Sequence, residues 1–165
     1  MAKAVLISIR PEWVEKILAG EKTLEVRKTR PNMTTPFKCY IYCTNSGVAM
    51  GLWEKHGKVV GEFTCNKVTN LFSNSQFWLN EDDVLQTCLS ATEIRKYANG
   101  ANGLYGWHIS KLEIYDDPKQ LNRFKPWNRE CKYNDLGFAI PNCGTCQDCI
   151  VKKPPQSWCY VEELK

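Results

Sequence analysis

Short strand-like segments recur along this chain, and the intervals between them are short and irregular. Repeated parallel strands would each need a crossover of about a dozen residues or more, usually a helix. The spacing therefore excludes repeated βαβ units and favours a mainly β fold with short helices, of the α+β class. We expect a small, partly closed β-barrel with helices over its openings. The predicted strands span residues 5–9, 22–28, 39–43, 59–68, 104–109, 112–115 and 158–161.

Three short helices are predicted from the residues at their ends. Pro11 suits the first position of a helix, where its missing N–H needs no partner, and Gly20 suits the position after the last turn. A second helix is expected to begin at Glu81. A third is expected from the capping box of Ser90 and Glu93, in which each side chain accepts a hydrogen bond from the other residue's backbone N–H.

The length and composition indicate one folded domain. The chain has 165 residues, so we expect residues 1–165 to form a single domain. Apolar residues make up 43% and charged residues 24%, a composition that excludes a disordered chain. No apolar run approaches the roughly 18–20 residues that cross a bilayer, and the apolar residues 4–9 are too few for a signal peptide. We therefore expect a cytoplasmic protein without a membrane partner.

The net charge of +4 comes from 22 basic and 18 acidic residues. The basic residues concentrate in two stretches, residues 10–38 and 119–133, as they would in a footprint for phosphate groups. A solvated surface that carries charges of both signs explains the same numbers. The charge alone thus favours an ordinary surface over a nucleic-acid footprint.

One segment, residues 17–27, places three charged side chains close together. A helix ends at its glycine and a strand begins at once, with Lys22 at the corner and with Glu25 and Arg27 on the polar face of the strand. Arg27 can grip a phosphate or a base edge. Lys22 can neutralise a phosphate or, when desolvated, act as a base or nucleophile, while Glu25 can orient Lys22, transfer protons or accept hydrogen bonds from a base amine. The alternative is a surface ladder of ion pairs that binds no ligand.

The same segment resembles the signature of the ASCH family, small-barrel relatives of the PUA RNA-binding domains. The family motif has the form G-x-K-x-x-E/T-x-R, and Gly20, Lys22, Glu25 and Arg27 fill its positions. With its flanking segments, the chain looks like the ASCH proteins of phages and mobile elements. The flanking segments that share in the resemblance are residues 7–11, 97–100, 104–109 and 154–161.

The resemblance implies that the protein binds RNA or a modified nucleobase in a cleft beside this motif. Arg10 and the basic loop 119–132 would extend a track for phosphate groups, and Ser157 is either a hydroxyl of the cleft or a turn residue. RNA or a modified nucleoside is the expected partner, and no organic cofactor is expected. The residues expected to contact the nucleic acid are Arg10, Lys22, Glu25, Arg27 and Ser157.

Two alternative functions stay open. One branch of the ASCH family hydrolyses the acetyl amide of N4-acetylcytidine with a lysine, a threonine and a glutamate, and ribonuclease activity is attributed to other members. Lys22 and Glu25 would be catalytic in such an enzyme. Lys22 matches the lysine, but Glu25 stands where that branch has its threonine, so the hydroxyl nucleophile is missing. The other alternative is a protein-interaction module of a phage or mobile element.

Three cysteines, Cys143, Cys146 and Cys149, are spaced as C-x2-C-x2-C. Structural zinc takes four thiolate or imidazole ligands, and C-x2-C units supply them in pairs. Cys131 is the expected fourth ligand, with Cys159 as the alternative. Zinc would hold in place a long Cys-rich loop that the core does not hold. The other possibility is a reduced loop without metal.

Metal analysis tests the Cys-rich loop, at about residues 125–155. Protein purified without chelator is expected to contain about one zinc ion per chain. Its thermal stability is expected to fall when a strong chelator removes the zinc, because the binding free energy of a structural metal contributes to folding. Atomic absorption and melting curves before and after chelation check both points. A metal-free preparation with unchanged stability would overturn the prediction.

Overall fold

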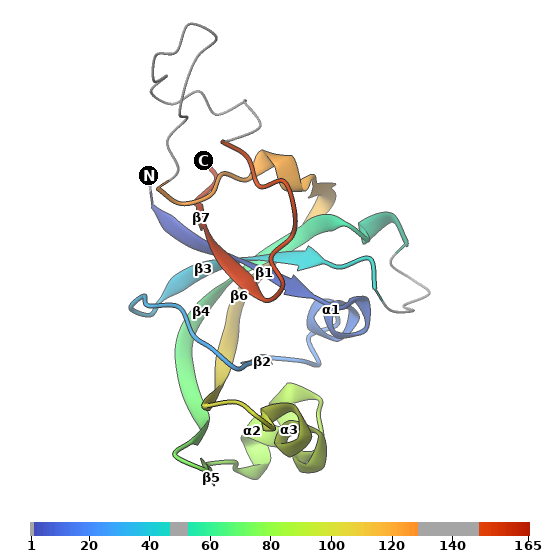
Figure 1. Ribbon diagram of the computed structural model, residues 1–165. Helices are drawn as coiled ribbons and strands as arrows, with labels where there is room; N and C mark the ends of the chain where they lie inside the picture. Colours follow the sequence, from blue (N-terminus) through green and yellow to red (C-terminus); the bar gives the residue numbers. More distant parts are fainter. Residues whose placement is uncertain (1, 47–52, 129–148) are drawn as a thin grey trace, which may run out of the picture.

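The computed structural model describes residues 2–46, 53–128 and 149–165, which form a seven-stranded sheet and three α-helices (Figure 1). The strands lie in the order β2–β6–β4–β3–β1–β7, and β5 pairs with β4 outside this path. β1 and β3 are parallel, and the other pairs are antiparallel. The strands are β1 (Lys3–Ile9), β2 (Leu24–Arg27), β3 (Phe37–Cys43), β4 (Lys58–Ser73), β5 (Gln76–Phe77), β6 (Gly103–Lys119) and β7 (Trp158–Glu162). The helices are α1 (Pro11–Leu18), α2 (Glu81–Thr87) and α3 (Ala91–Ala98), with 3-10 turns η1 (Trp53–Lys55) and η2 (Leu121–Arg123).

The three predicted helices and the mainly β, α+β class are confirmed. Pro11 opens α1, and Gly20 follows it with a φ of +75°, a left-handed conformation that suits glycine. Ser90 and Glu93 form both hydrogen bonds of the capping box at the start of α3. No helix within the described ranges is both long enough and apolar enough to cross a membrane.

The predicted strands 104–109 and 112–115 are one continuous strand, β6. β4 likewise extends beyond the predicted range 59–68, and the two long strands pair along their lengths with four register shifts. Such bulges bend and twist a ribbon while keeping it paired. At the far end of the ribbon the chain leaves β4, forms β5, α2 and α3, and returns into β6, so the two helices lie together beyond β2 (Figure 1).

The sheet is not closed into a barrel, which corrects the expectation from the sequence. Its outer strands are β2 and β7, and within the described residues β2 pairs only with β6. Side chains bridge the gap instead. Arg27 Nη2 donates to the carbonyl oxygen of Ser8 in β1 at 2.6 Å, and Arg27 Nη1 donates to Ser157 Oγ, just before β7, at 3.3 Å. A guanidinium group thus takes the place of a backbone ladder between these strands.

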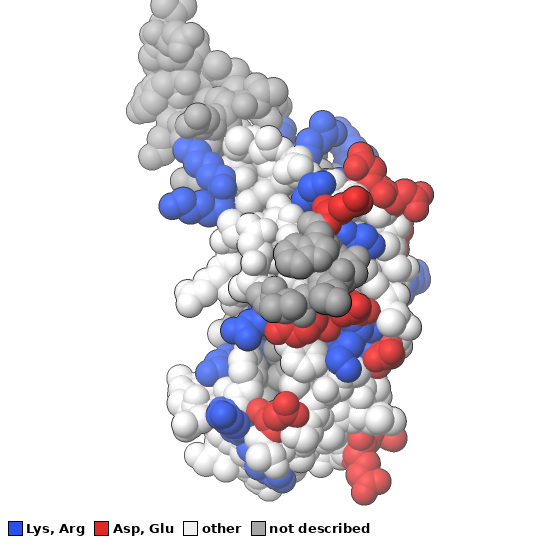
Figure 2. Space-filling model, turned by 90° about the vertical axis from the view of Figure 1, so that its right-hand side faces the viewer, with Lys and Arg blue, Asp and Glu red and all other residues white. Residues whose placement is uncertain are grey.

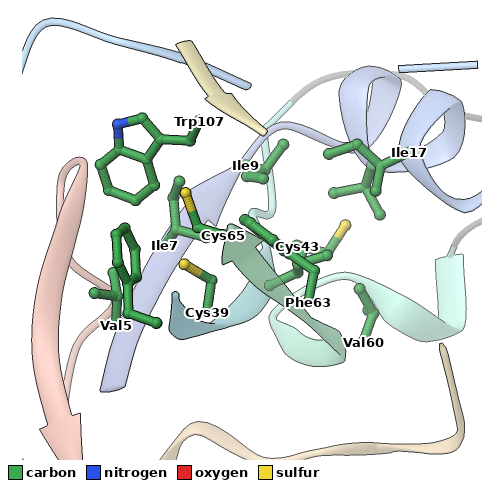
Figure 3. Packing of buried hydrophobic residues seen from close by; sticks show 13 residues of the cluster. Val5, Ile7, Ile9, Ile17, Cys39, Cys43, Val60, Phe63, Cys65 and Trp107 are labelled. Carbon is green, nitrogen blue, oxygen red and sulfur yellow. The ribbon is translucent and has the colours of Figure 1, made fainter. Parts of the chain in front are cut away.

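A buried apolar cluster packs between α1 and the sheet (Figure 3). Trp107 is fully buried, and its ring meets those of Phe37 and Trp158 edge-on, with centroids 5.8 Å and 5.9 Å apart. Cys39 and Cys65 lie among these apolar side chains (Figure 3), and burial raises the pKa of the Cys65 thiol to about 11. These cysteines therefore act as small apolar residues of the core.

Gly61 lets β4 and β6 approach closely at a register shift. A β-carbon at this position would collide with the backbone carbonyl oxygen of Glu113, which cannot move without disturbing the strand pairing. Gly61→Ala is therefore expected to lower the free energy of unfolding by about 1–3 kcal/mol, the usual range for overpacking. Chemical denaturation measures this change. The control is Glu113→Ala, which removes an exposed side chain at the same place and is expected to change stability by less than about 0.5 kcal/mol. Equal stability of the two variants would contradict the prediction.

Candidate functional site

A cleft of about 650 Å³ lies beside β2, at the gap where the sheet stays open. Residues of β1, α1 and α3 line its sides. Residues 154–156, which precede β7 in the sequence, also line it. Its volume falls within the roughly 300–1,000 Å³ typical of sites for small ligands. β2 itself contributes Glu25, Val26 and Arg27 to the lining. Every residue of the sequence motif except Gly20 therefore reaches this cleft, since Lys22 also lines it.

The side chains of Lys22, Glu25 and Arg27, called the ion cluster below, are buried, and Glu25 contacts both of the other two. Their residues are 3%, 6% and 8% exposed. Glu25 Oε2 lies 3.4 Å from Lys22 Nζ, and Glu25 Oε1 lies 2.9 Å from Arg27 Nη2. The sequence predicted Lys22 at the corner before a half-buried strand, and Glu25 and Arg27 on the polar face of that strand. The structure buries them because each charge has an opposite charge beside it, which offsets much of the free energy of desolvation.

All three N–H donors of the Lys22 ammonium group have an acceptor. Besides its contact with Glu25, Nζ donates to the backbone oxygens of Leu24 at 3.0 Å and of Thr87 at 2.8 Å. Thr87 is the last residue of α2, where the partial negative charge of helix carbonyls gathers. The backbone N–H of Thr23 also donates to the carbonyl oxygen of Gln86 at 3.0 Å. Lys22 therefore joins α2 to β2.

The guanidinium group of Arg27 fastens the segment before β7 to the cleft. It binds the carbonyl oxygen of Ser8 and the hydroxyl of Ser157. Ser8 makes two further bonds to the same segment, from its hydroxyl to the carbonyl oxygen of Pro155 at 2.6 Å and from its N–H to the carbonyl oxygen of Ser157 at 2.9 Å. Ser157 thus belongs to the network that borders the cleft.

Four residues with larger or charged side chains line the cleft around the ion cluster. Arg10 has a side chain that is 69% exposed, with the carboxylate of Glu12 4.0 Å away, and Tyr97 is 41% exposed. Trp13 and Glu93 line the cleft from α1 and α3. Partial burial raises the pKa of the Tyr97 phenol, so that phenol is neutral at pH 7. Hydrogen bonds from the backbone and hydroxyl of Ser90 lower the pKa of the Glu93 carboxyl group, so Glu93 is ionised there. Arg10, Glu93 and Tyr97 are called the rim below.

The basic loop that was expected to extend the phosphate track lies elsewhere in its described part. Lys119 and Arg123 line a different hollow, and Lys119 Nζ sits 3.1 Å from the centroid of the Tyr115 ring. Residues 129–132 lie outside the described residues. On the face shown in Figure 2, basic and acidic side chains are interspersed. The described residues on that face therefore form no continuous basic stripe.

Three of the predicted zinc ligands, Cys131, Cys143 and Cys146, lie outside the described residues, so the zinc site stays a prediction. Cys149 is described and buried. Cys159, the alternative ligand, lies in β7, where burial raises the pKa of its thiol to about 11. Within the described ranges no group of three or more His, Cys, Asp or Glu residues is placed to hold a metal ion.

Among the residues of the site that sequence reasoning missed are Ser8, Thr87 and Tyr97, together with Trp13 and Glu93, which line the cleft. Ser8 and Thr87 act through their backbone oxygens, and a backbone oxygen leaves no trace in the residue type. Tyr97 carries a detectable signal, since it follows Glu93 by four positions and both lie on one face of a predicted helix. A charged residue and an aromatic residue at that spacing lie on the same side of a helix and can line one wall of a cleft.

Comparison with known proteins gives a family and a fold. The model of the ASCH domain family matches residues 7–116. No curated protein matches the chain. The fold is similar to crystal structures of ZmASCH, the ASCH protein of Zymomonas mobilis. A tyrosine-to-phenylalanine variant has a TM-score of 0.62 at 18% identity over 98% of this chain and 92% of that one. The unsubstituted protein has a TM-score of 0.61 at 19% identity over 97% of this chain and 88% of that one. A serine-to-alanine variant has a TM-score of 0.62 at 18% identity over 97% of this chain and 89% of that one.

Substitution of Lys22 tests whether the ion cluster holds the fold. Lys22→Met removes the donor to two backbone oxygens and one of the two cations beside Glu25, so it is expected to lower the free energy of unfolding by about 3 kcal/mol. The control is Lys16→Met in α1, whose half-exposed side chain lies 3.8 Å from Glu21. That variant is expected to lose less than about 1 kcal/mol. Urea denaturation compares the two, and a loss as small in Lys22→Met as the one expected for Lys16→Met would show that Lys22 has no structural role.

Proposed function

This chain belongs to the ASCH domain family, and on this basis we propose that its cleft binds RNA by taking up one nucleobase, plain or modified. The observation that carries the proposal is the ion cluster in the wall of a base-sized cleft, where Glu25 is held between two buried cations. A carboxylate fixed in this way accepts hydrogen bonds from the edge of a base. Membership of the family supports a nucleic acid as the kind of partner.

The aromatic residues of the cleft supply the second part of the proposal. Tyr97 from α3 and Trp13 from α1 both line the cleft, and Tyr97 is exposed enough to meet a ligand. Stacking of a base on an aromatic side chain contributes about 1–3 kcal/mol without dependence on sequence. Arg10 at the rim supplies an exposed cation for a phosphate group of the same strand.

The contacts around the cleft support binding ahead of hydrolysis. A nucleophilic amine needs a free lone pair, and a nucleophilic hydroxyl needs a base within hydrogen-bond reach. The N–H donors of Lys22 are all directed to fixed acceptors, and the described side-chain contact of the Ser157 hydroxyl is with the Arg27 guanidinium, which is a donor. In this arrangement neither side chain is prepared to attack a carbonyl carbon or a phosphate.

Binding of a short, fluorescently labelled single-stranded RNA tests the proposed function. Tyr97→Ala is expected to weaken binding about ten-fold, because it removes a stacking surface. The matched control is Trp78→Ala, which removes another exposed aromatic side chain that does not line the cleft and is expected to leave the affinity unchanged. The affinity should also fall as salt rises, with a slope of about 0.7 per neutralised phosphate. Fluorescence anisotropy at several salt concentrations measures both effects.

Three outcomes would replace the proposal. Equal loss of affinity in Tyr97→Ala and Trp78→Ala would show that RNA binds outside the cleft. Absence of binding to any RNA at low salt would favour a protein partner, as in the interaction-module alternative. Release of acetate from N4-acetylcytidine, or cleavage of the RNA during the assay, would favour the hydrolase alternative at the same site.

A further inference from the structure

The unpaired edge of β2 places main-chain hydrogen-bonding groups at the cleft. The N–H of Ile109 in β6 donates to the carbonyl oxygen of Thr23 at 2.9 Å, and from there β2 and β6 pair residue by residue. In antiparallel pairs the main-chain groups of alternate residues point toward the partner strand. Those of Leu24 and Val26 therefore point away from β6, and the carbonyl oxygen of Leu24 indeed accepts from Lys22 on that side.

Val26 presents its N–H and C=O on this edge. It lines the cleft and is 6% exposed, and within the described residues no other strand pairs with the edge. Main-chain polar groups that are buried need a partner from protein, water or ligand. An occupant of the cleft is thus met by one main-chain donor and one main-chain acceptor, held by the sheet.

The carboxylate of Glu25 adds acceptor capacity beside these groups. A carboxylate has about four lone-pair positions, and the contacts with Lys22 and Arg27 use one oxygen each. Lys22 directs its donors to Glu25 and to two backbone oxygens, and Arg27 Nη2 serves both Glu25 and Ser8. Among the described residues Arg27 Nε is a buried donor without a hydrogen-bond partner, so the cluster offers one free side-chain donor beside the spare lone pairs of Glu25. A phosphate group here would therefore meet one free donor together with a carboxylate of its own charge. A neutral group with N–H donors fits the site better.

From this balance of acceptors over donors we infer that the cleft selects nucleobases with an exocyclic amine over bases without one. The inference rests on the proposed function and names the class of base. The amine of cytosine or adenine offers two N–H donors beside a ring-nitrogen acceptor, and cytosine carries a carbonyl acceptor as well. The guanine edge offers its ring N–H and its amine beside one carbonyl acceptor. Uracil offers one N–H donor between two carbonyl acceptors. Lys22 and Arg27 are positioning residues in this recognition, since they fix the carboxylate.

Matched RNAs that differ at one base test the inference on the unmodified protein. The pairs are cytosine against uracil, adenine against hypoxanthine and guanine against hypoxanthine, each in an otherwise identical short single strand. The amine-bearing member is expected to bind about ten-fold more tightly in at least one pair, as for one good contact to a base edge. Inorganic phosphate at millimolar concentration is expected not to change this preference.

A pair of variants assigns the preference to the carboxylate. Glu25→Gln replaces one acceptor oxygen by an N–H donor, so it is expected to reduce the preference to less than about three-fold. Glu113→Gln makes the same change at an exposed carboxylate that does not line the cleft, and it is expected to keep the preference. Circular dichroism checks that both variants fold.

The outcomes distinguish a failure of this inference from a failure of the proposed function. Binding of RNA with equal affinity for both members of every pair, or with a preference for the bases without the amine, overturns this inference and leaves the proposed function intact. A preference that persists in folded Glu25→Gln overturns the role of the carboxylate. Absence of binding to every RNA overturns the proposed function and this inference together. Because the comparison of RNAs needs no variant, it decides the matter even when Glu25→Gln does not fold.

Discussion

The carboxylate of Glu25, held below the surface between Lys22 and Arg27, is the interaction on which the rest of the structure depends. Through Lys22 it is connected to the last turn of α2, and through Arg27 to β1 and the segment before β7. An isolated charge at this depth would be strongly destabilising, so each member of the ion cluster requires the others. The same contacts shape the cleft, and site and fold therefore share one set of residues.

Local signals explain what the sequence could predict. Helix ends at Pro11 and Ser90 depend on a few neighbouring residues, and so they appear in the sequence. The proximity of Lys22 to Glu25 could be predicted for the same reason, since they are three positions apart. Their burial could not, because it depends on a backbone oxygen 65 positions away along the chain, at Thr87. The open sheet also depends on long-range pairing, which alternating apolar residues do not specify.

An open sheet has two edges that can pair with another chain, and both are protected here in different ways. Residues 125–127 cover the edge of β7, with hydrogen bonds from Trp127 to Tyr160 and from Glu162 to Lys125. The edge of β2 faces the cleft, between side chains of α1 and α3. One edge is therefore closed by the chain itself, while the other is recessed and still reachable by a small molecule or an extruded base.

The excursion that carries α2 and α3 leaves β4 and returns into β6, two strands already paired along their lengths. It has its own small apolar cluster, in which Ile94 and Ala98 of α3 pack on Leu71, Leu104 and Val26. A segment anchored in this way has its own apolar packing and is connected along the chain to the sheet through β4 and β6 at its two ends. Insertions and substitutions within it can remodel one wall of the cleft while the central sheet stays as it is, so relatives can diverge in the ligands they accept without changing architecture.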